Sequence, residues 1–148
     1  MARGRSHRTG RVAVGVVWCG VLAVGCVLTP RLIEGYDALQ VTRFHARRIG
    51  GPRVGEHARK AGRAAARVID LVAPLPWSRE AARLALDAAS SLESRNRPSA
   101  LAAYEDVDAA LERATASPFR GAGLRALADE ARARRDEART VPAGGSHP

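Results

Sequence analysis

The sequence has few aromatic residues, only two cysteines and almost no lysine. Six of its 148 residues are aromatic, and Lys60 is the single lysine among 24 basic residues. Alanine, with 30 residues, supplies much of the 46% hydrophobic content. Because each alanine side chain buries little area, the expected core is thin. The composition therefore predicts a modest helical domain and excludes an enzyme with a deep substrate cavity.

Charge is also missing from one long stretch of the chain. Residues 12–30 carry none, whereas residues 1–11 carry four arginines and no acid. Residues 31–80 add a net +5 and residues 81–148 are neutral overall, so the net charge of +9 belongs to the first half of the chain. The arginine, alanine and glycine content is typical of GC-rich bacterial genomes. The chain resembles small membrane-anchored proteins of such bacteria, a resemblance that implies no activity.

The uncharged stretch contains an apolar run, residues 12–28, which predicts a transmembrane signal-anchor. Its 17 residues rise roughly 25 Å as a helix, the short end of what crosses a bilayer. A cleaved secretory signal and a lipoprotein signal share the same basic start and apolar middle, so both stay open. Arginines are denser before the run than directly after it. This asymmetry predicts a basic cytoplasmic N-terminus over residues 1–11, in the inner (cytoplasmic) membrane, and an extracytoplasmic C-terminal domain.

Small residues and cysteines within the run indicate two candidate sites. The five residues that end at Cys26 partly resemble a bacterial lipobox, which implies lipidation of that cysteine. Gly15, Cys19 and Ala23 form a ladder of small residues, four apart, that would let two membrane helices pack in a homo-oligomer. Cys19 and Cys26 lie about 10 Å apart along a helix, too far for a disulfide.

After the run, the spacing of apolar residues predicts a basic, helical juxtamembrane region over residues 29–76. One helix is expected over residues 31–49, before a Gly-Gly-Pro turn. In the next, residues 53–72, apolar residues gather on one face and five cations gather on the other. These cations are candidate contacts to anionic lipid or to an acidic envelope protein, with a solvated helix face as the alternative: Arg53, Arg59, Lys60, Arg63 and Arg67.

Residues 77–140 predict a helical domain, and the tail, residues 141–148, is expected to be disordered. Ser78 and Ser117 are expected to cap the N-termini of two of its helices, and a third is expected to begin near Pro98. The predicted fold class is all-α: one N-terminal transmembrane helix followed by a small helical bundle or helical hairpin.

Part of this domain resembles a tetratricopeptide unit. The resemblance covers residues 79–118, with Ala100, Tyr104 and Pro118 as the matching residues. Val107 stands where a small residue is usual, the proline comes late, and no second copy follows at the expected period. The resemblance implies a helical hairpin and, for function, the binding of a partner.

No pattern in the sequence predicts catalysis, a cofactor or a metal site. His45 and His57 stand twelve apart among cations and are expected on the surface. Glu105, Asp108 and Glu112 share a helix face opposite the apolar stripe, so they are expected to be solvated. The scarcity of aromatic residues disfavours a nucleic-acid partner.

The sequence thus favours a non-enzymatic structural or adaptor module of the cell envelope, held by a single-pass anchor. One alternative is a lipoprotein acylated at Cys26 with a helical periplasmic domain. The other alternative, which is based on the high net charge, is a basic nucleic-acid-binding protein that faces the cytoplasm.

Overall fold

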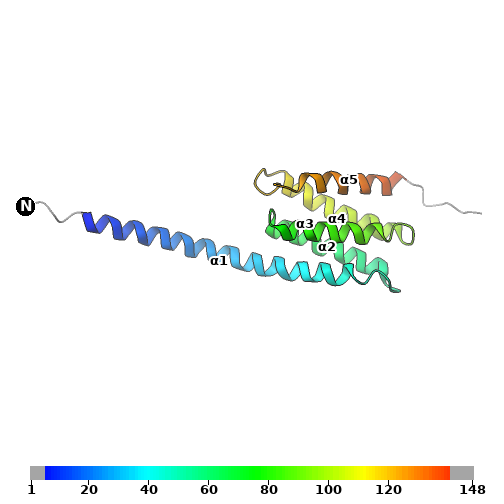
Figure 1. Cartoon of the computed structure of the whole chain (residues 1–148), viewed down its shortest axis with the longest axis horizontal. Helices are drawn as coiled ribbons and strands as arrows, with labels where there is room; N and C mark the ends of the chain where they lie inside the picture. The colour runs from blue at the N-terminus through cyan, green and yellow to red at the C-terminus, as the bar shows by residue number, and fades with distance from the viewer. Residues whose placement is uncertain (1–5, 141–148) are drawn as a thin grey trace, which may run out of the picture.

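The computed structural model describes the backbone of residues 6–140 and the side chains of residues 24–140. Its described part is all-helical, as the sequence predicts, with five helices and no strand (Figure 1). The helices are α1 (Ser6–Ala46), α2 (Val54–Val72), α3 (Pro76–Ser90), α4 (Arg97–Thr115) and α5 (Arg125–Thr140). The predicted disordered tail, residues 141–148, lies outside the described residues.

The first helix is continuous through a proline and extends well beyond the other four (Figure 1). The predicted apolar run and the predicted helix after it form this one element. Pro30 has no N–H to donate to the Cys26 carbonyl, four residues earlier, so that carbonyl lacks its usual helical partner. The Thr29 hydroxyl donates to the neighbouring Gly25 carbonyl at 2.7 Å.

No helix in the part of the chain whose side chains are described combines the length and apolar character that a bilayer crossing requires. Residues 12–23, which make up most of the predicted span, have side chains outside the described residues.

Helix α2 lies at the centre of the bundle, in contact with α1, α3 and α4, and α5 packs mainly on α4. Helices α1 and α2 are antiparallel, because Gly35 lies against Val72 at one end and His45 against His57 at the other. Helices α2 and α4 are parallel and unusually close. A Cβ atom added to Gly62 would lie 2.8 Å from the Ala103 Cα, so only glycine fits at this crossing.

One hydrophobic core joins all five helices, and it follows the predicted apolar stripes. The stripe of α4 is fully buried, with Tyr104, Val107 and Leu111 each at 0% exposure. Burial raises the pKa of the Tyr104 hydroxyl, and its hydrogen bond to the Glu93 carboxylate raises it further. The remaining core is rich in alanine, which allows the helices to approach closely.

Two predicted helix starts are wrong. Helix α3 begins at Pro76, not at Ser78, because a proline fixes the backbone angle that the first helical turn needs. Ser78 therefore falls inside the helix, where it is buried. The last helix begins at Arg125 rather than at Ser117, because residues 116–124 form a turn in which Gly123 takes the left-handed conformation.

The prediction that the acidic face of α4 is solvated is wrong for its central residue. Asp108 is only 2% exposed, because α5 packs over this face and its Arg135 pairs with the Asp108 carboxylate. The neighbouring pair between Arg139 and Glu105 is exposed, with its nearest atoms 2.7 Å apart.

Candidate anion-binding site

A pocket of about 320 Å³ lies where the first turns of α2 and α4 meet. Three of the five predicted anion contacts, Arg53, Arg59 and Arg63, line it. The lining residues are Pro52, Arg53, Gly55, Glu56, Arg59, Arg63, Asn96 and Ser99.

A glycine allows the two helix ends to meet at this pocket. A Cβ atom on Gly55 would lie 2.5 Å from the Asn96 amide nitrogen and 2.8 Å from the Ser99 hydroxyl. Asn96 is the N-cap of α4, and its side-chain oxygen accepts from the Ser99 backbone N–H at 3.2 Å. The positive ends of two helix dipoles are therefore close together here, which favours a negative group.

The arginines of the pocket differ in how they are held. Arg59 donates from Nε to the Ser99 hydroxyl at 3.0 Å, which fixes its guanidinium against α4. Arg53 and Arg63 take part in no ion pair among the described residues. Guanidinium groups bind carboxylates and phosphates through paired hydrogen bonds. The pocket is therefore suited to holding an oxyanion.

Glu56, the only acidic residue of the lining, forms an ion pair with a lysine. Lys60 approaches the Glu56 carboxylate to 2.6 Å, one helical turn away on α2. Hydrogen bonding from Lys60 lowers the pKa of Glu56, and the charges of Lys60 and Arg53 add to this effect. The carboxylate stays ionised and its charge is balanced locally, so the surplus of the pocket is positive.

The other two predicted cations do not line the pocket. Lys60 forms an ion pair with Glu56, and Arg67 forms one with Glu34 of α1 near the opposite end of α2. The five cations share one face of α2, but the structure divides them into three around the pocket and two in ion pairs.

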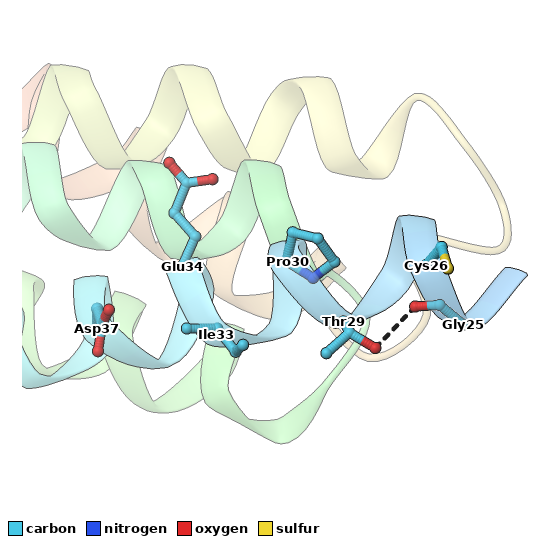
Figure 2. A pocket seen from close by; sticks show the side chains of 7 residues that line it. All are labelled: Gly25, Cys26, Thr29, Pro30, Ile33, Glu34 and Asp37. Atoms are coloured by element: carbon cyan, nitrogen blue, oxygen red, sulfur yellow. Dashed lines mark hydrogen bonds between the residues drawn. The ribbon is translucent and has the colours of Figure 1, made fainter. Parts of the chain in front are cut away.

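The candidate lipidation site lies elsewhere, on α1. Cys26 is an exposed free thiol in a shallow groove whose lining residues all come from this one helix (Figure 2). Gly15, Cys19 and Ala23, the predicted packing ladder, have side chains outside the described residues.

His45 and His57, which the sequence predicts to lie on the surface, are partly buried and meet across the α1–α2 hairpin. The Nδ1 atoms of His45 and His57 lie 2.8 Å apart, so one ring must donate to a neutral partner. Burial lowers the pKa of His45, and the charges of His57, Lys60 and Arg48 lower it further, against the opposing effect of Glu56. The only signal in the sequence was the spacing of twelve around a Gly-Gly-Pro turn.

This pair predicts that the bundle loses stability in mild acid. In the unfolded chain, His45 has its ordinary pKa near 6.5, and in the folded chain its pKa is lower. As the pH falls below about 6.5, the unfolded chain therefore binds more protons than the folded chain. The contribution is complete above the unfolded pKa and is lost as pH falls through the folded one. Thermal unfolding between about pH 7.5 and about pH 5 checks this. The wild type should lose more stability than the double variant His45→Gln/His57→Gln, and equal losses would contradict the assignment.

The pocket supplies guanidinium groups that can bind an anion, and the histidine pair supplies two imidazole rings. Among residues 24–140, no three side chains of the metal-ligating types gather within reach of one ion. Comparison with protein-family models, curated proteins and solved structures finds no match to this chain.

Proposed function

We propose that this protein is a non-enzymatic adaptor held in a bacterial cytoplasmic membrane by residues 12–28. Its N-terminus faces the cytoplasm, and its bundle binds an acidic envelope protein through the pocket of Arg53, Arg59 and Arg63. The uncharged run and the arginines before it support the anchor. The unbroken helix α1 supports a direct connection from that run to the bundle.

The choice between an acidic protein and anionic lipid as the partner rests on the position of the pocket. Helix α1 leaves the bundle at the end where Gly35 lies against Val72, whereas the pocket is built on the first turns of α2. The 18 steps of the helix from Val54 to Val72 separate these two ends by about 27 Å. The headgroup layer of one leaflet is only about 6 Å thick. The pocket therefore faces away from the lipid that would surround the anchor, which favours an acidic protein over anionic lipid.

The proposal predicts that charge reversal in the pocket weakens binding of acidic peptides. The full chain, reconstituted in phosphatidylcholine vesicles, is titrated with a fluorescein-labelled decaglutamate peptide at low salt. Arg53→Glu/Arg63→Glu should weaken binding by about tenfold or more. The matched control, Arg83→Glu/Arg125→Glu, changes the net charge equally at exposed arginines outside the pocket. It should weaken binding by less than about threefold.

Each alternative to the proposal predicts its own result, in this titration or in a companion experiment. Equal weakening by both double variants would mean that the peptide responds to the net charge of the protein and not to the pocket. Release of the protein from the vesicles by an alkaline wash would contradict the anchor. Palmitate labelling in cells that is lost in Cys26→Ala would favour the lipoprotein, and preference for a single-stranded oligonucleotide over the peptide would favour the nucleic-acid-binding alternative.

A further inference from the structure

Exposed apolar side chains mark one end of the bundle. Outside α1, the exposed large hydrophobic residues of the described part are Leu75, at 37%, and Phe119, at 85%. Neither lies in a helix, because Leu75 belongs to the α2–α3 turn and Phe119 to the α4–α5 turn. Apolar residues scattered singly over a surface need no explanation, whereas apolar residues gathered at one place mark an interaction site.

These two turns lie at the same end of the bundle. Arg120, next to Phe119, donates to the Asp70 carbonyl at 2.7 Å, near the C-terminus of α2. The Leu75 N–H donates to the Val72 carbonyl at 2.8 Å, at that same C-terminus. Figure 1 shows both turns on the side of the bundle from which α1 extends.

This end also carries the groups that membrane interfaces favour. The rings of Tyr36 and Trp77 lie 5.6 Å apart, centroid to centroid, where α1 meets α3. Arg31 and Arg79 are exposed and form no ion pair among the described residues. Tyrosine and tryptophan gather at the level of lipid headgroups, and arginine binds their phosphates.

The length of α1 sets how close this end would come to the lipid. Gly35 lies level with the end of the bundle and follows Leu28, the last residue of the apolar run, by seven positions. Seven residues of helix rise about 10 Å, and the headgroup layer accounts for about 6 Å of this distance. The two turns project beyond the helix ends, so their side chains would reach the remaining few ångströms to the headgroups.

We propose that the end of the bundle formed by Leu75, Phe119 and Trp77 lies against the headgroups of the membrane that residues 12–28 cross. This inference rests on the anchor proposed above. Phe119 and Leu75 insert their apolar side chains between headgroups, and Arg31 and Arg79 contact lipid phosphates. The bundle is thereby held upright on the membrane, with its anion-binding pocket directed away from it.

Quenching of tryptophan by brominated lipid tests this contact in the full chain. Trp18→Phe leaves Trp77 as the only tryptophan, and a matched reporter carries Trp18→Phe/Trp77→Phe/Ser94→Trp, with its tryptophan at the opposite end. In vesicles of phosphatidylcholine brominated near the headgroup, quenching of Trp77 should exceed that at position 94 by about threefold or more. Adding Phe119→Asp/Leu75→Asp should remove most of the difference. The control Val41→Asp, an exposed residue further along α1, should leave it unchanged.

Flotation of the same vesicles separates failure of this contact from failure of the anchor. Protein that floats with equal quenching at the two positions would overturn the docked end and leave the anchor intact. Protein that does not float would overturn the anchor. Loss of helicity in the Phe119→Asp/Leu75→Asp variant, measured by circular dichroism, is not expected, because Phe119 is 85% exposed and Leu75 is the N-cap of α3, a position that aspartate favours. The single variant Phe119→Asp, at the more exposed position, gives a second measurement.

Discussion

Replacing Gly62 with leucine is expected to lower the free energy of unfolding by about 3 kcal/mol or more. The nearest atoms to an added Cβ are the backbone and Cβ of Ala103, at 2.8 and 3.0 Å, and neither can rotate away. Helices α2 and α4 would have to separate along their whole parallel contact. For a bundle of about 100 residues, the loss corresponds to a fall in Tm of about 10 °C or more.

A series of substitutions makes this expectation specific to the close approach. Gly62→Ala should also destabilise the protein, but less than Gly62→Leu, because alanine adds only the Cβ atom and its gain of about 1 kcal/mol in helix propensity offsets part of that clash. Gly25→Ala is the matched control, since Gly25 is also helical and has nothing within 4 Å of an added Cβ. Chemical denaturation of all three variants measures the differences. A Gly62→Leu protein as stable as the wild type would show that the two helices do not cross at this residue.

Replacing Arg135 with alanine is expected to cost about 2–4 kcal/mol, because it leaves the Asp108 carboxylate buried without its cation. Asp108 has a side chain only 3% exposed, and that of Arg135 is 21% exposed. The second carboxylate oxygen of Asp108 already lacks a hydrogen-bond partner within the described residues. Among the residues whose side chains are described, Asp108 has no other ion-pair partner, so the cost should appear in full on thermal or urea unfolding.

The adjacent pair supplies the control for this cost. Arg139 on α5 also binds an acid of α4, Glu105, but both side chains are about half exposed. Arg139→Ala should therefore cost less than about 1 kcal/mol. The double variant Asp108→Asn/Arg135→Ala should recover part of the loss, because the unpaired charge is gone. Equal effects of Arg135→Ala and Arg139→Ala would contradict the burial of Asp108.

Much of the fold could be predicted from the period of the apolar residues. The apolar residues of α2, and Tyr104, Val107 and Leu111 of α4, recur at steps of three and four. This spacing predicts that one face of each helix is buried, but not which element covers it. Helix starts were harder, because Pro76 competes with Ser78 as the first signal along the chain. The burial of Asp108 could not be foreseen, since it depends on which face of α4 is covered by α5.

The candidate site could be predicted only in part, for the same physical reason. Helical spacing put Arg53, Arg59 and Arg63 on one face of α2, and the structure keeps them together. What the spacing could not give was the partner surface. The Asn96 cap and the Ser99 hydroxyl come from a segment about 40 residues further along the chain. The meeting of His45 with His57 is likewise a product of how a hairpin closes.

The unbroken helix α1 has a mechanical consequence for an anchored protein. Its 41 residues form a rod about 60 Å long, and no hinge of loop residues separates the apolar run from the part that packs on α2 and α3. A bundle joined in this way cannot swivel independently of its anchor. The height of the arginine pocket above the bilayer and the direction in which it faces would be set by the tilt and rotation of a single membrane helix. A partner that turns that helix would re-aim the pocket without changing its shape.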